Sequence, residues 1–299
     1  MPQYELVMHK IYILACFCLL SATMSFSQNH YWEASYGLGI STYWGDLSAT
    51  SVTSNFGNLT AGGTLYAQYN KNSYVGFRTA LTFTRLEGDD YKANSEVQRM
   101  RNLNFYSPLV ELAFMMEYNL FGFDPKDKEQ RFSPTLFLGI GIFGFNPKTD
   151  YRDVTVELQP LGTEGQGIEG FANKYKRIQP SIPFGAGMKI KLKHNLSLSF
   201  EILARYTLTD YIDDLSTRYV NYDILSANNG VLSANLSERQ DEFFGQSEGS
   251  FAETTGGTIR GGPDVNDYYV TMFFSLRYNL GKTFSLKNRN RKGAHCPKF

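Results

Sequence analysis

Eight segments of the chain alternate apolar and polar residues with a period of two, the pattern of a β-strand whose two faces meet different surroundings. In one of them, Leu198, Phe200 and Ile202 alternate with Ser199 and Glu201. The eight segments lie at residues 30–41, 59–69, 74–83, 108–120, 135–143, 178–192, 196–208 and 268–280. Beyond the N-terminus no stretch is apolar enough for a transmembrane helix, so the pattern predicts an all-β fold.

The connections between these segments alternate in length. Short connections lie at residues 70–73, 122–131 and 193–195, and long ones at 46–58, 86–104, 146–177 and 210–266. An even number of strands with short turns at one end and long loops at the other is typical of outer-membrane barrels, in which closure of the sheet satisfies every backbone group. The sequence therefore predicts an eight-stranded antiparallel transmembrane β-barrel of the outer-membrane type, with four long extracellular loops and short periplasmic turns.

A soluble secreted β-sandwich or lipocalin-like barrel is the alternative, because its strands also alternate but bury the apolar face. Two features favour the membrane barrel. Aromatic residues such as Trp32 and Tyr278 stand near strand ends, where interfacial girdles lie. The polar faces also carry more charges than one solvated sheet needs: Arg78, Glu111, Glu117, Lys189, Lys191, Glu201, Arg205 and Arg277.

An eight-stranded barrel is only wide enough for its own side chains. We therefore expect the inward charges, which include both signs, to pair as a plug. A barrel filled in this way would conduct little current. The predicted interior network consists of Arg78, Glu111, Glu117, Lys189, Glu201, Arg205 and Arg277.

The two ends of the chain differ from the barrel segments. Lys10 precedes an apolar run at 11–26, and Ser25 and Ser27 fit a signal-peptidase site, so residues 1–27 are predicted to be a signal peptide. The run is too short for a spanning helix, and it continues past Cys16, which disfavours a lipoprotein. The barrel is expected over residues 28–282, followed by a basic periplasmic tail at 283–299. The tail residues predicted to bind a partner are Lys287, Arg289, Arg291 and Lys292.

Composition narrows the function classes. Among 299 residues, Lys plus Arg and Asp plus Glu both number 29, which gives no basic excess for nucleic acid. The charge is uneven along the chain, because residues 210–265 hold ten acids and three bases, whereas the stretch after Leu280 holds six bases and no acid. Cys296 is the one cysteine left after the signal peptide, so no intramolecular disulfide is expected.

The acidic stretch "TDYIDD" contains the candidate chemistry, at Asp210, Asp213 and Asp214. Calcium is one interpretation, since it takes carboxylate oxygens, although the spacing lacks the EF-hand pattern. A two-carboxylate mechanism is another. A solvated loop start with turn-forming aspartates is the third. No histidine falls in a long loop, and no G-x-S-x-G, P-loop or HExxH pattern occurs, so we expect no enzyme, cofactor or small-molecule substrate.

Three stretches, "YGLGISTYWGDLS", "LQPLGTEGQG" and "RYTLTDYIDDLSTRYVN", resemble the PorG-like outer-membrane barrels of the Bacteroidetes type IX secretion system. The resemblance spans most of the mature chain. It implies an outer-membrane protein, without catalytic residues, that associates with the periplasmic ring of the PorK lipoprotein and PorN. The motif residues are Gly45, Asp46, Leu47, Gly162, Thr163, Glu164, Gly165, Asp210, Tyr211, Asp213 and Asp214.

The resemblance implies a non-enzymatic part of this secretion system, which would anchor or couple the ring to the outer membrane and, in gliding species, support motility. The expected partners are outer-membrane lipid and PorK/PorN-like ring proteins, with both termini in the periplasm. The alternative is an OmpA-like structural or adhesive outer-membrane barrel without a secretion role, in which the outer loops would carry the function.

Overall fold

The computed structural model describes residues 30–48, 58–125, 130–193, 195–251, 255–262 and 265–281. Within these ranges no helix is long and apolar enough to cross a membrane. The predicted signal peptide and the predicted basic tail, with Lys287, Arg289, Arg291 and Lys292, lie outside the described residues.

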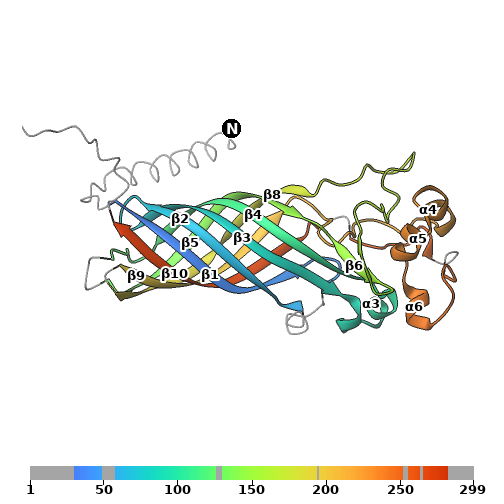
Figure 1. The fold of residues 1–299 in the computed structure, drawn as a ribbon, viewed down its shortest axis with the longest axis horizontal. Coiled ribbons are helices and arrows are strands. Elements are labelled where there is room, and N and C mark those ends of the chain that lie inside the picture. Colours follow the sequence, from blue (N-terminus) through green and yellow to red (C-terminus); the bar gives the residue numbers. More distant parts are fainter. Residues whose placement is uncertain are drawn as a thin grey trace, which may run out of the picture.

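Eight antiparallel strands close into a barrel (Figure 1), which confirms the predicted fold. Each of these strands pairs with its neighbours along the barrel, and the first strand pairs with the last, so that the barrel wall has no free edge. The strands are β1 (Tyr31–Trp44), β2 (Thr60–Asn70), β3 (Val75–Asp89), β4 (Asn104–Asn119), β5 (Phe132–Phe145), β8 (Ile178–Lys193), β9 (Leu196–Thr207) and β10 (Tyr268–Gly281).

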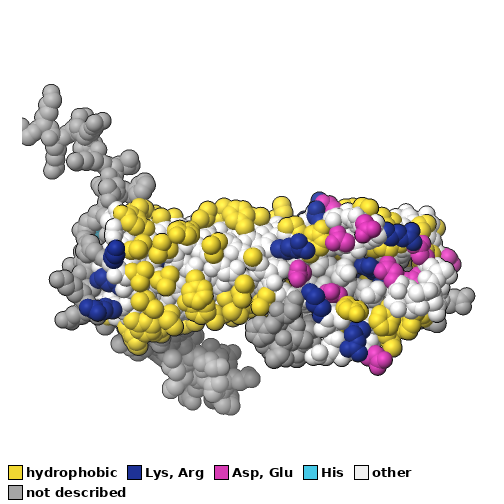
Figure 2. All heavy atoms as spheres, turned by 60° about the horizontal axis from the view of Figure 1, so that its bottom comes forward, with side chains coloured by type: hydrophobic (Ala, Val, Ile, Leu, Met, Phe, Trp, Pro, Cys, Tyr) yellow, Lys and Arg dark blue, Asp and Glu magenta, His cyan; other side chains and the backbone are white. Residues whose placement is uncertain are grey.

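Burial alternates residue by residue along these strands. The outward residues are large and apolar, and Leu65, Phe114, Ile140 and Phe274 are each more than half exposed. Their neighbours along each strand face inward, and those of Leu65, Phe114 and Phe274 are buried. On the side drawn in Figure 2, the apolar residues form a belt along the barrel, with charged side chains gathered at its two ends. This belt is the lipid-facing surface of an outer-membrane barrel.

Ion pairs fill the barrel interior. Arg78 Nη1 lies 2.8 Å from Glu201 Oε2, and Arg205 Nε lies 3.0 Å from Glu111 Oε2. Among the described strand residues, the buried charges are four cations and four carboxylates, and no side chain in these pairs is more than 1% exposed. The interior charge therefore sums to zero. The eight residues are Arg78, Lys189, Arg205, Arg277, Glu33, Glu111, Glu117 and Glu201.

Arg277 is the centre of this network. Its Nη1 lies 3.0 Å from Glu117 and its Nη2 lies 3.0 Å from Glu33, while Lys189 also pairs with Glu117. Glu33 was absent from the network predicted from the sequence, although it lies on the polar face of the first segment. Lys191, in contrast, is only partly buried near the end of β8.

The two ends of the barrel differ. The described parts of the short connections at residues 71–74, 120–131 and 194–195 lie at one end, here called the turn end. The described parts of the loops at 45–59, 90–103, 146–177 and 208–267 lie at the other, the loop end, and form what we call the cap (Figure 1). The elements in the cap are η2 (Asp90–Lys92), α3 (Glu96–Arg101), β6 (Lys148–Tyr151), β7 (Val154–Glu157), α4 (Tyr222–Asn228), α5 (Val231–Ser237) and α6 (Gln240–Phe244).

The cap has a hydrophobic core that continues into the barrel mouth. Leu47, Leu103, Leu158, Leu215 and Leu236, each no more than 4% exposed, come from all four loops. They pack in one cluster with aromatic residues of the barrel strands, among which are Tyr43, Phe105, Phe143 and Tyr269. The loops are therefore packed on the barrel as a folded layer.

Candidate functional site

The three motif segments of the sequence meet at the junction of cap and barrel. Asp213 accepts hydrogen bonds from the Tyr43 hydroxyl at 2.6 Å and from the Leu47 N–H at 3.3 Å. Asp214 Oδ2 accepts from the Thr163 hydroxyl, and its Oδ1 accepts from Tyr175 at 2.6 Å. The aspartate segment thereby ties the first loop to the third.

Glu164 joins the third loop to the fourth. Its carboxylate accepts from the backbone N–H groups of Ser216 and Thr217 at 3.0 and 3.2 Å, and from the Thr217 hydroxyl at 2.8 Å. It also pairs with Arg260 Nη1 at 3.0 Å, and both side chains are 1% exposed. Arg260 donates in addition to the Asp214 carbonyl at 2.7 Å. A buried pair with this many partners is costly to break, because either charge alone would lie unpaired in the cap.

The second loop is held through Arg101, the last residue of α3. Its guanidinium lies 2.7 Å from Asp90, and it donates to the carbonyls of Asp46 and Arg260, each at 2.8 Å. Asp46 Oδ2 in turn accepts from the Gly262 N–H at 2.7 Å. Motif residue Asp46 therefore links the first loop to the fourth.

Two motif glycines are needed for close approach and for backbone shape. A Cβ on Gly45 would overlap both the Tyr43 hydroxyl and the Asp267 carboxylate. Gly165 has a φ of 80°, in the left-handed region that favours glycine, and a Cβ there would lie 2.7 Å from the Phe171 ring. Tyr211, also in the motif, stacks on Tyr175 with ring centroids 4.6 Å apart.

The Tyr43 hydroxyl lies between two carboxylates. Its oxygen is 2.6 Å from Asp213 Oδ2 and 2.8 Å from Asp267 Oδ1, and all three residues are fully buried. One phenolic hydrogen serves only one of these contacts, and ionised carboxylates only accept. The second contact therefore requires a protonated carboxyl. Burial, followed by the neighbouring charge of Asp46 for Asp213 and of Asp213 for Asp267, raises the pKa of both carboxyls well above the ordinary range.

The other two aspartates of the stretch are also perturbed. Burial raises the pKa of Asp210 to about 7 and that of Asp214 to about 6. Asp210 is 8% exposed, and Asp213 and Asp214 are 0% exposed. The interpretation of this stretch as a solvated loop start is therefore wrong. No local pattern in the sequence indicates that the loops pack over it.

The three aspartates do not converge on one point. Asp213 bonds to groups of the first loop and of β1, whereas Asp214 bonds to groups of the third loop. Across the described ranges, no group of three or more His, Cys, Asp or Glu side chains is arranged to hold a metal ion. The geometry thus favours a hydrogen-bonding role for Asp213 and Asp214 in holding the cap.

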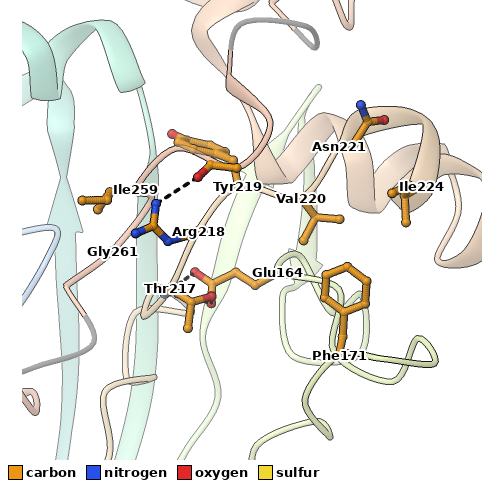
Figure 3. Close-up of a pocket in the computed structure, with 11 residues that line it drawn as sticks. Glu164, Phe171, Thr217, Arg218, Tyr219, Val220, Asn221, Ile224, Ile259 and Gly261 are labelled. Atoms are coloured by element: carbon orange, nitrogen blue, oxygen red, sulfur yellow. Dashed lines mark hydrogen bonds between the residues drawn. The ribbon is translucent and has the colours of Figure 1, made fainter.

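A pocket of about 730 Å³ opens on the cap beside this junction (Figure 3). The extended segment 217–221 lines it, together with Phe171 of the third loop, Ile224 of α4 and Ile259 of the fourth loop. Figure 3 shows Ile259 on one side of this segment and Phe171 and Ile224 on the other. Sequence reasoning missed this pocket, and it also missed Tyr43, Arg101, Arg260 and Asp267. The sequence signals for these residues are weak, since Arg260 is one of three arginines in an acidic loop and Asp267 lies just before the last strand.

A closed, lipid-facing barrel with a packed polar cap defines the class of protein, an eight-stranded outer-membrane β-barrel. Within that class, the chain belongs to the family described as domain of unknown function DUF6089, which matches residues 9–236. No curated protein matches the chain.

Several solved structures are similar to it. Ail of Yersinia pestis, in complex with the heparin analogue sucrose octasulfate, is 10% identical with a TM-score of 0.38, covering 84% of this chain and 99% of its own. Neisserial surface protein A is 11% identical with a TM-score of 0.39, covering 83% of this chain and 96% of its own. A major outer-membrane protein of Thermus thermophilus is 12% identical with a TM-score of 0.39, covering 84% of this chain and 99% of its own.

Proposed function

We propose that this barrel is a non-enzymatic outer-membrane component of the type IX protein secretion system, and that it anchors or couples the periplasmic ring to the outer membrane. The closed interior supports this role best. Four cations and four carboxylates occupy the lumen as ion pairs, so the barrel offers no path for an exported chain and suits an anchor. The link to this particular machine rests on the PorG-like motifs.

The orientation proposed here puts the turn end and both termini in the periplasm and the cap outside the cell. The turn end exposes Lys71, Arg131 and Lys193. The sequence after Leu280 adds six bases and no acid. A basic surface of this kind fits an acidic patch on PorK/PorN-like ring proteins, because complementary charge speeds and orients docking.

The experiment compares culture-supernatant proteomes. A strain lacking the protein is complemented with the full chain, with the chain lacking residues 283–299, or with a chain in which Lys287, Arg289, Arg291 and Lys292 are replaced by Gln. The matched control replaces Asn288 and Asn290 by Gln in the same segment. Cell fractionation verifies that each chain reaches the outer membrane.

We expect cargo with C-terminal secretion signals to be lost from the supernatant in the deletion strain and in both strains with an altered tail. The full chain and the asparagine control should restore it. In a gliding host, spreading on agar should follow the same pattern. Normal secretion in the deletion strain would overturn the export role. If both altered chains restore secretion, the tail is not part of the proposed contact with the ring proteins.

A further inference from the structure

An unpaired strand edge borders the pocket of Figure 3. Thr217 and Tyr219 bond to the segment 257–261, with the Tyr219 N–H donating to the Thr258 carbonyl and the Arg260 N–H donating to the Thr217 carbonyl, each at 2.9 Å. Arg218 stands opposite Ile259 as an antiparallel bridge. In this pattern alternate residues direct their backbone groups to opposite edges.

The N–H and C=O groups of Arg218 and Val220 therefore face away from segment 257–261. Within the part of the chain that the structure describes, neither residue forms a backbone hydrogen bond. Arg218 is exposed and Val220 is half-buried. Figure 3 places Phe171 and Ile224 on this side of the segment.

The walls of the pocket are apolar in part, at Phe171, Ile224 and Ile259. Phe171 and Ile224 remain 42% and 41% exposed. A peptide that adds to a sheet as a further strand gains affinity from backbone hydrogen bonds and specificity from pockets that take its alternate side chains. The unpaired edge offers the first and the pocket offers the second. The junction residues Glu164 and Thr217 also line the pocket, so the edge lies directly beside the buried junction of cap and barrel.

We propose that this edge binds an extended polypeptide segment as an added β-strand, with apolar side chains at alternate positions entering the pocket. The occupant is a peptide because the free groups on this edge are those of a backbone strand, at strand spacing. Among the described residues of this loop, the exposed charges are those of Asp223, Glu242, Glu248 and Arg218, an excess of acids that favours cationic over acidic flanks. This inference goes beyond the proposed secretion role and does not depend on it.

The test uses the full chain in detergent micelles and fluorescence anisotropy. The probe is a fluorescein-labelled peptide of about nine residues, with Val and Thr alternating between lysine flanks. Two further peptides carry N-methyl groups on alternate backbone nitrogens, one on the odd and one on the even positions. These peptides keep the side chains but each lose the hydrogen-bond donors of one strand edge.

We expect the unmethylated peptide to bind and one methylated peptide to bind about tenfold or more weakly, while the other retains affinity, because only one edge pairs. Val220→Pro removes the N–H at the edge and should reduce binding similarly. Val231→Pro is the matched control, since Val231 is the first residue of α5, where proline is tolerated, and lies outside the pocket. If Val220→Pro disturbs the cap, Ile224→Ala tests the pocket wall instead, with Val231→Ala as its control.

Equal binding of all three peptides, or unchanged binding by both Val220→Pro and Ile224→Ala, would overturn the proposal. Another occupant is a second copy of this chain. It would appear in light scattering as a dimer that Val220→Pro dissociates and that the peptide does not compete with, and this result would also overturn the proposal. Because the assay uses purified protein, its failure would not affect the secretion experiment.

Discussion

The ion pair between Glu164 and Arg260 should determine whether the cap stays packed on the barrel. Glu164→Ala removes a carboxylate that accepts from Ser216, Thr217 and Arg260, and leaves the Arg260 charge buried with only carbonyl partners. Breaking one side of a buried pair costs about 3–5 kcal/mol. Since about 1.4 kcal/mol is tenfold in an equilibrium constant, cap opening should rise by more than about 100-fold.

The loss should be local, because the barrel strands are held by their own ladder of hydrogen bonds. Hydrogen exchange followed by mass spectrometry separates cap peptides from barrel peptides in the folded protein. We expect faster exchange in the segments around Leu215 and Arg260, and unchanged exchange in β2 and β9. The matched control is Glu248→Ala, which breaks the exposed pair with Arg152, whose side chains are 71% exposed for Arg152 and 35% for Glu248. Exposed pairs contribute about 0–1 kcal/mol.

A double-mutant cycle tests the physical reason. The cycle uses Glu164→Gln alone, Arg260→Met alone and the two combined. Each single variant leaves one buried charge uncompensated, whereas the double variant removes both charges. The double variant should be less destabilised than the sum of the single variants, with a coupling of about 2 kcal/mol or more. The reasoning is refuted if Glu164→Ala speeds exchange no more than Glu248→Ala, or if the cycle is additive.

Three further outcomes are expected. Arg277→Met should destabilise the whole barrel by about 3–5 kcal/mol in urea unfolding followed by heat-modifiable gel migration, because Glu33 and Glu117 then share Lys189 as their one remaining cation. The unaltered barrel should give no steady channels in planar bilayers, since ion pairs fill the lumen. Cap exchange, corrected for intrinsic rates, should be slower near pH 5 than near pH 8. The raised pKa values of Asp210, about 7, and Asp214, about 6, mean that ionisation penalises the closed cap as the pH rises from the ordinary aspartate value of about 4 to about 7. Asp210→Asn should reduce this dependence.

The barrel could be predicted from the sequence because lipid and interior impose opposite chemistry on alternate residues. The strand ends could not be placed in the same way. The sequence suggested a loop from residue 86 and a strand from Pro108, yet β3 continues to Asp89 and β4 begins at Asn104. Pro108 lacks an N–H but still pairs in register with Arg85. The pairing of β3 with β4 therefore extends beyond the residues whose apolar–polar alternation identifies the lipid-facing part of these strands.

The candidate site was predicted as residues but not as an arrangement. The aspartates and the Gly-Thr-Glu-Gly loop stood out by their motifs, whereas their partners lie far away in sequence. Asp213 is 170 residues from Tyr43, and Glu164 is 96 from Arg260. A local sequence pattern cannot indicate such pairs, and without them a carboxylate in a long loop is expected to be exposed to solvent. The structure shows instead that these carboxylates are buried.

The buried charges of the barrel interior and of the junction between cap and barrel imply that the two regions respond differently to pH. In the barrel, four cations match four carboxylates, so every buried carboxylate there has a cation to pair with. At the junction of cap and barrel, the described buried carboxylates outnumber the two arginines, Arg101 and Arg260, that pair with them. Those carboxylates are Asp90, Glu164, Asp210, Asp213, Asp214 and Asp267. The carboxylates without an arginine partner are stabilised by hydrogen bonds from backbone N–H groups or by being protonated. A cap held in this way should open in response to pH or to a competing partner before the barrel does. The cap, rather than the membrane-spanning wall, is therefore the part of the molecule suited to change state.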